Sequence, residues 1–163
     1  YDLYRDSHFS VLYYSERLSL HKRLNTFIEI VLAITTSSSA VALLWFWNTS
    51  VGQEVWKYVL VVSAILAVIK PVIKLTEKVQ QYEETLTGYR GLNNDLKIIV
   101  VQIHQSKQYE IPHKTKLLEA LSRQGELLKK SPEAKLEKKL EAKCRTQVMK
   151  ELPAKHFFVP EDK

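Results

Sequence analysis

The segments FIEIVLAITTSSSAVALLWFW (27–47) and VWKYVLVVSAILAVIKPVI (55–73) decide the fold of this chain. Only the short polar segment 48–54 separates them. At about 1.5 Å per residue, each segment would be about 30 Å long as a helix, which matches the hydrocarbon core of a bilayer. The sequence therefore predicts a membrane hairpin of two transmembrane helices. The alternative is a pair of helices buried in the core of a soluble protein.

Basic residues lie mainly on one side of this hairpin. Lys22 and Arg23 precede the first span, and Lys70 and Lys74 lie at the end of the second, whereas the loop end carries Lys57 alone. The positive-inside rule therefore predicts that both termini are cytoplasmic, with these four flanking basic residues close to the lipid headgroups. Aromatic residues that favour the opposite interface gather at the loop end, namely Trp45, Trp47, Trp56 and Tyr58.

The remaining sequence predicts helices and leaves room for one small cytoplasmic domain. The fold class is an all-α membrane protein: an N-terminal amphipathic helix at 1–26, a two-transmembrane hairpin at 27–74 and a C-terminal cytoplasmic helical domain at 75–163. The 163 residues include 4 Gly and 5 Pro, which is few for a loop-rich fold. The single Cys144 excludes a disulfide framework within the chain and fits a reducing cytosol.

A heptad pattern follows the hairpin and predicts an oligomer. Apolar residues alternate spacings of three and four along one side of a helix, with Asn93 as the polar exception. We interpret this side as a seam between copies in a homo-oligomer, formed by Val79, Tyr82, Leu86, Tyr89, Asn93 and Leu96. The same pattern continues backwards into the second span, which predicts one helix of about fifty residues, kinked near Pro71.

Two further helices are expected after this one. Ile111 and Pro112 indicate a break, since the residue before proline avoids helical geometry, and a helix at about 114–130 follows. Ser131, Pro132 and Glu133 match the cap, first-turn proline and first-turn acid of a helix start. The last helix is therefore predicted to begin there.

The sequence gives little support to catalysis. The five histidines fall on different segments without metal-ligand spacing, and Cys144 has no neighbour in the sequence that would lower its pKa. We therefore expect no enzyme activity, no catalytic or metal-binding residue and no cofactor. Segment 129–155 is basic, but aromatic residues are not interleaved with it, which argues against nucleic acid. Anionic lipid and ordinary solvation remain open for this segment.

The first span carries a polar face. Asn25, Glu29 and Thr36 follow helical spacing along one side, and we single them out as a candidate pore face. An acid within a membrane segment is a functional hypothesis by default. The alternative is that Glu29 lies close enough to the interface for its carboxylate to reach water.

The whole layout resembles the SLATT family of small two-transmembrane proteins that accompany nucleotide-signalling sensors in bacterial defence systems. The likeness rests on an aromatic and basic first helix (Tyr13, Tyr14, Arg17, His21 and Arg23), the tight hairpin, and the segment that runs from KLTEK at 74–78 through Tyr82 and Glu83 to Leu86. Membership implies an oligomeric effector in the bacterial inner membrane. A cytoplasmic sensor protein or nucleotide signal would trigger it to form a pore or otherwise break the permeability barrier. This corresponds to an antiviral defence function.

Two other functions remain open from the residues alone. The chain would serve equally as a membrane anchor or scaffold that does not conduct ions and presents its helical domain to a partner. It would also serve as a constitutive channel or transporter subunit. In all three cases the lipid bilayer is a partner.

Overall fold

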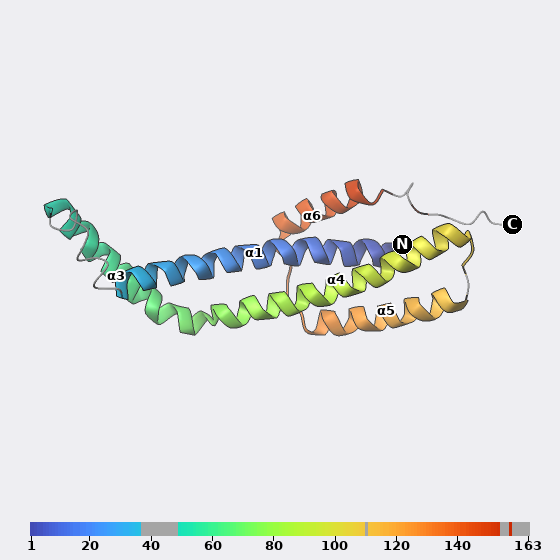
Figure 1. Cartoon of the computed structure of the whole chain (residues 1–163), viewed down its shortest axis with the longest axis horizontal. Helices are drawn as coiled ribbons and strands as arrows, with labels where there is room; N and C mark the ends of the chain where they lie inside the picture. Colours follow the sequence, from blue (N-terminus) through green and yellow to red (C-terminus); the bar gives the residue numbers. More distant parts are fainter. Residues whose placement is uncertain (37–48, 110, 154–156, 158–163) are drawn as a thin grey trace. The chain divides into compact units, whose positions relative to one another are not determined.

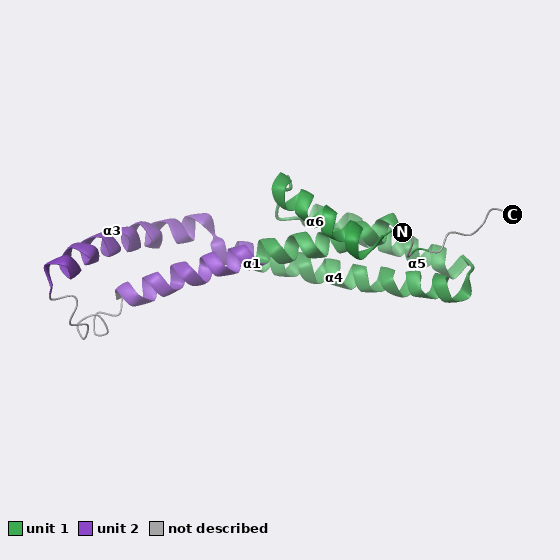
Figure 2. Ribbon diagram, turned by 90° about the horizontal axis from the view of Figure 1, so that it is seen from above, with its two compact units in different colours: residues 1–18, 80–163 green, residues 19–79 purple. Residues whose placement is uncertain are grey.

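The computed structural model describes residues 1–36, 49–109, 111–153 and 157, and its regular structure in these ranges is helical (Figure 1). The all-α prediction is confirmed. The helices are α1 (Asp2–Thr36), α3 (Ser50–Ile73), α4 (Leu75–Ser106), α5 (Ile111–Lys129) and α6 (Lys138–Glu151). Residues Tyr1–Leu18 and Gln80–Lys163 form one compact unit, and residues Ser19–Val79 form a second (Figure 2). We call them unit 1 and unit 2.

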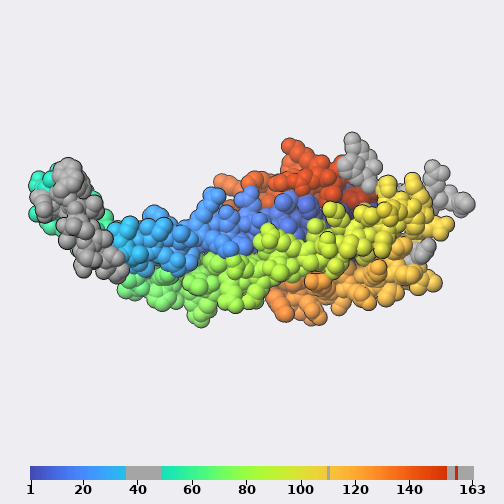
Figure 3. Space-filling model, in the orientation of Figure 1, coloured from blue at the N-terminus to red at the C-terminus, as the bar shows by residue number. Residues whose placement is uncertain are grey.

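Unit 1 contains two pairs of helices. The first half of α1 lies beside α6, and α4 lies beside α5 (Figures 1 and 3). Arg5 donates to the Leu152 carbonyl oxygen at 3.1 and 2.8 Å, which ties the start of α1 to the end of α6. Cys144 and Val148 of α6 are buried. The N-terminal segment, predicted as a separate element, is thus part of the same bundle as the C-terminal helices.

Two glycines bring α5 close to α4. A Cβ at Gly88 would overlap the side chain of Leu127, and one at Gly91 would lie 2.6 Å from Nη2 of Arg123. Arg123 in turn forms an ion pair with Asp95 of α4 at 2.7 Å. The helix tolerates two glycines here because their missing side chains make room for α5.

Unit 2 contains the apolar helix α3. Thr49 caps it, with its side-chain oxygen accepting from the Gly52 amide at 3.1 Å. Among the described helices, this is the one that is long and apolar enough to cross a membrane. The predicted first span is described up to Thr36, where it forms the end of α1, and its remaining residues lie outside the described part. The structure therefore establishes one candidate span.

Three predicted boundaries were wrong. The second span was predicted to begin at Val55, but α3 already begins at Ser50 behind its cap. The predicted continuous helix near Pro71 is divided in two, since Lys74 adopts left-handed backbone angles (φ 51°, ψ 44°) and ends α3. The last helix begins at Lys138 and not at Ser131. The break at Ile111 is confirmed, because α5 starts at this residue.

Candidate functional site

The first candidate surface is the apolar exterior of α3. In the most apolar 18-residue stretch of α3, only 6% of the residues are buried, and the mean hydropathy is 1.8. Large side chains are exposed on more than one side of the helix, among them Val61, Val62, Ile65, Val68 and Val72. A helix that is apolar all round belongs in a protein core or a membrane. The described residues provide no such core around α3, so its surface requires another apolar environment.

The second candidate is a polar cluster at one end of α3. Lys70 donates to the Glu29 carboxylate at 3.0 Å, and the amide of Asn25 donates to the same oxygen at 3.0 Å. The acid of the candidate pore face is thus neutralised by a base on α3, which the sequence analysis placed only among the lipid-proximal residues. Thr36 is the last residue of α1, and its side chain lies outside the described part. The structure brings Asn25 and Glu29 together and adds Lys70 to them.

Two polar atoms in unit 2 are buried without a hydrogen-bond partner in the described structure, Asn25 Oδ1 and Ser63 Oγ. Burying such an atom unpaired costs about 1–3 kcal/mol. Both oxygens are therefore acceptors that water or another polar group could satisfy. The other predicted lipid-proximal residues, Lys22, Arg23 and Lys74, are exposed, and Lys74 pairs with Glu77 at 3.1 Å.

The predicted oligomer seam packs within the chain. Tyr82, Leu86, Tyr89 and Leu96 of α4 are buried, and Val79 is half-buried. The ring of Tyr14 on α1 stacks on that of Tyr89, with centroids 5.4 Å apart. Ser7, also on α1, donates to the side-chain oxygen of Asn93 at 3.0 Å. Contact between copies through these residues stays a prediction, and it would require α1 to move away from α4.

A largely buried acid, which the sequence predicts as part of a helix start, contacts both α1 and α4 in unit 1. Glu133 belongs to the irregular segment 131–137 between α5 and α6, which we call the strap. Its carboxylate accepts hydrogen bonds from Tyr13 (2.5 Å) and Arg17 of α1 and from Tyr82 of α4. The Glu133 side chain is 10% exposed. The one carboxylate therefore joins the strap to two helices.

Neighbouring groups of the strap complete this network. The Tyr13 hydroxyl accepts from the Glu137 amide at 3.0 Å, and the Tyr14 hydroxyl shares a hydrogen bond with Ser131 at 2.9 Å. Glu137 also contacts Arg17 at 3.3 Å. Side chains of α1 thus hold both ends of the strap, through the Ser131 hydroxyl at one end and the Glu137 backbone amide at the other.

The Glu133 network shifts the ionisation of its members. Burial opposes the charge on Glu133, but the hydrogen bonds from Tyr13, Tyr82 and Arg17 outweigh it and hold the pKa of the carboxyl below its ordinary value. Burial, together with the hydrogen bond to Glu133, raises the pKa of Tyr13 to about 12 and also raises the pKa of Tyr82. Glu133 is therefore a carboxylate at neutral pH, and both tyrosines are hydrogen-bond donors.

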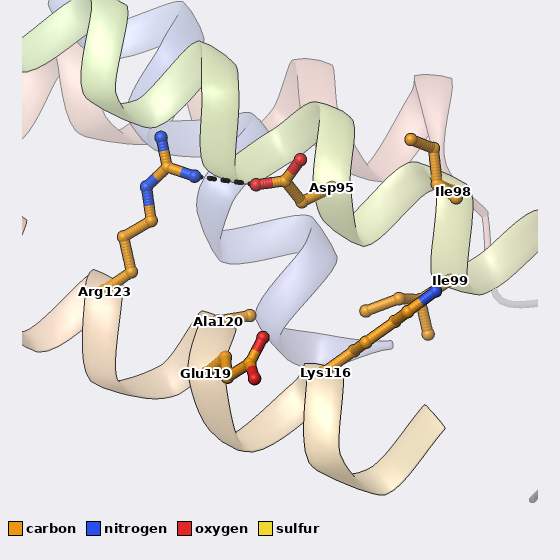
Figure 4. A pocket seen from close by; sticks show the side chains of 7 residues that line it. All are labelled: Asp95, Ile98, Ile99, Lys116, Glu119, Ala120 and Arg123. Atoms are coloured by element: carbon orange, nitrogen blue, oxygen red, sulfur yellow. Dashed lines mark hydrogen bonds and ion pairs between the residues drawn. The ribbon is translucent and has the colours of Figure 1, made fainter. Parts of the chain in front are cut away.

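Unit 1 also contains two notable pockets, neither with an evident catalytic set. One of about 340 Å³, with a mixed polar and apolar lining, lies between α4 and α5, where Arg123 reaches Asp95 along one side (Figure 4). An apolar one of about 330 Å³ is lined by Tyr4, Ile99 and Tyr109, among others. Across the described ranges, no cluster of histidine, cysteine or acidic residues has metal-binding geometry. Burial raises the pKa of the Cys144 thiol, which lowers its reactivity at neutral pH.

Comparison of the chain with protein-family models, curated proteins and solved structures finds no match. The functional argument therefore rests on the residues and contacts described above.

Proposed function

We propose that this chain is a membrane protein with a two-span hairpin, and that both of its termini lie in the cytoplasm. The exposed apolar surface of α3 carries this proposal, because burying such side chains gains about 25 cal/mol for each Å² removed from water. The aromatic residues at the loop end and the basic residues Lys22, Arg23, Lys70 and Lys74 support the orientation. In this proposal, α3 is the second span of the hairpin and the segment 27–47 is the first.

We further propose that the chain is an oligomeric effector of the bacterial inner membrane that opens a pore, or otherwise disrupts the membrane, when a cytoplasmic sensor or nucleotide signal triggers it. Support comes from the polar residues on the hairpin helices, including the unpaired Asn25 Oδ1 and Ser63 Oγ, and from the layout that resembles the SLATT family. In addition, α1 runs without a break from unit 1 into unit 2. A change in the cytoplasmic bundle would thus be transmitted directly to the first span.

A second function, a non-conducting anchor, is favoured by two contacts. Lys70 neutralises Glu29, and α1 covers the heptad residues of α4. The first contact is that of a closed hairpin, and the second is that of a helical bundle that packs within one chain. An effector in this state is inactive and needs a trigger, whereas an anchor needs none.

Permeability measurements separate these functions. Purified protein in liposomes loaded with a fluorescent dye, and in planar bilayers, should release dye and conduct ions under conditions that induce oligomers. If the pore uses the candidate face, Glu29→Gln should lower cation preference and Thr36→Leu should lower conductance, with assembly unchanged. Conductance that both variants leave unaltered would remove this face from the pore. Absence of leakage in every oligomeric state would favour the anchor.

A constitutive channel subunit is distinguished in cells. A triggered effector at low expression, without its trigger, should leave growth and membrane potential unchanged. A constitutive channel would lower the membrane potential at the same expression level.

A further inference from the structure

Unit 1 is built from two helix pairs with their own internal contacts. In the first pair, His8 of α1 contacts Glu151 of α6 at 2.6 Å, Glu16 contacts Lys143 at 2.9 Å, and the guanidinium of Arg145 lies over the Phe9 ring at 4.8 Å. In the second pair, α4 and α5 interlock at the two glycines and at the Asp95–Arg123 ion pair. Each pair therefore has contacts that do not depend on the other.

The interface between the pairs is the heptad side of α4. It includes the buried Leu86 and Leu96, tyrosine rings, with Tyr14 stacked on Tyr89 and lying 6.3 Å from the Tyr82 ring, and the hydrogen bond from Ser7 to Asn93. This surface has the spacing of a seam that can pair with another helix, and α1 occupies that place in the closed chain. Separation of the two pairs would expose it.

Glu133 connects the two pairs at this interface. Its carboxylate accepts from Tyr13 and Arg17 in the first pair and from Tyr82 in the second, and the strap that carries it runs from α5 to α6. Hydrogen bonds to a charged group are stronger than neutral ones, and this carboxylate makes three of them in a largely buried place. The contacts across the interface therefore depend strongly on a single ionised side chain.

We propose that Glu133 is a latch that keeps α1 and α6 closed over α4, and that its release exposes the heptad seam to the same seam of a second copy. The second copy is the expected occupant because the seam repeats without a break from Val79 to Leu96, and its polar member, Asn93, is suited to fix the register of a helix pair. This inference rests on the proposed oligomeric effector, for which it supplies the step between trigger and assembly.

The test measures opening and assembly separately in the full-length chain in mild detergent. Ser7 of α1 is fully buried and donates to Asn93 of the seam, so a Ser7→Cys reporter, in a Cys144→Ser background, reacts with a thiol reagent only when the seam opens. Glu133→Gln turns three hydrogen bonds to a charge into neutral ones, so labelling should accelerate by about a hundredfold, the change in an equilibrium that a loss of about 2.7 kcal/mol produces. The particle mass should shift from one copy to multiples.

The matched control is Glu137→Gln, which removes a carboxylate from the same strap. Glu137 is 51% exposed at its side chain and has a longer contact to Arg17, so labelling and mass should stay close to wild type. If Glu133→Gln fails to fold, Tyr82→Phe removes one donor and keeps the ring, and a smaller acceleration is expected.

Two results would overturn the proposal. Equal labelling rates in the Glu133 and Glu137 variants would show that Glu133 is no latch. Faster labelling with an unchanged particle mass would show that the opened seam takes no second copy. Neither readout uses membrane permeability, so a failure of the pore function in liposomes is distinguishable from a failure of the latch.

Discussion

Replacement of Tyr82 by phenylalanine tests the Glu133 network most cleanly, because it deletes one oxygen atom and leaves the ring in place. The deleted hydroxyl donates to the Glu133 carboxylate. Tyr14→Phe is the matched variant, since its hydroxyl lies in the same cluster but bonds to the neutral Ser131 side chain at 2.9 Å. The two substitutions differ mainly in whether the lost hydrogen bond involves a charge.

The expected magnitudes follow from that difference. A hydrogen bond to a charged group contributes about 1.5–3 kcal/mol, and a neutral one contributes about 0.5–1.5 kcal/mol. Tyr82→Phe should therefore lower the free energy of unfolding by about 2 kcal/mol, and Tyr14→Phe by about 1 kcal/mol. In a Glu133→Gln background the loss at Tyr82 should fall to the neutral value, whereas the loss at Tyr14 should stay the same.

Urea unfolding of the full-length protein in detergent micelles, followed by circular dichroism, measures these differences. The pH dependence has a definite sign, because the pKa of Glu133 is lower in the folded chain than its ordinary value of about 4.3. The stabilisation is fully present above about pH 4.3 and is lost as the pH falls through the folded pKa. Equal losses for Tyr14→Phe and Tyr82→Phe, or no coupling to Glu133, would refute the charged network.

Two further predictions concern helix packing and the hairpin. Gly125→Ala should stabilise α5 by up to about 1 kcal/mol, because a Cβ at this position meets nothing within 4 Å. Gly88→Ala should give no such gain, because the Leu127 side chain would have to move. Chemical unfolding compares the two variants, and equal gains would contradict the close packing of α4 and α5. In a conducting oligomer, Lys70→Gln should raise cation preference, opposite to Glu29→Gln, because it leaves the Glu29 charge uncompensated. Reversal potentials in a salt gradient measure this, and shifts in the same direction would remove the pair from the conduction path.

Local sequence patterns predicted most of the helices. The hydrophobicity of 55–73 identified α3, and the proline at position 112 identified the break before α5. These features depend on neighbouring residues, so they are visible in the sequence. The heptad spacing likewise identified the buried side of α4, but periodicity gives no information about which helix covers that side. The structure places α1 there.

The start of the last helix shows why local signals fail. Ser131 does accept the backbone hydrogen bond from Glu133 that a helix cap would make, at 3.3 Å. The helix does not follow, because Glu133 and the Glu137 amide are held by Tyr13, Arg17 and Tyr82, which lie far away in the sequence. The same long-range contacts form the Glu133 network, so local patterns predicted neither. The Glu29–Lys70 pair also joins residues distant in sequence.

The proposed topology predicts the side of the membrane on which each exposed segment lies. Gln53, near the start of α3, and Ser122, on α5, are both exposed, so single cysteines at these positions report opposite sides in a Cys144→Ser background. Cys144 itself is unsuitable as a cytoplasmic marker, because it is buried.

Labelling of these two cysteines with a membrane-impermeant thiol reagent tests the hairpin most directly. The account predicts that Gln53→Cys reacts in intact cells, and that Ser122→Cys reacts only after the membrane is permeabilised. Reaction of Ser122→Cys but not of Gln53→Cys in intact cells would reverse the orientation. Protection of both until permeabilisation, with the protein recovered in the soluble fraction, would contradict the membrane hairpin.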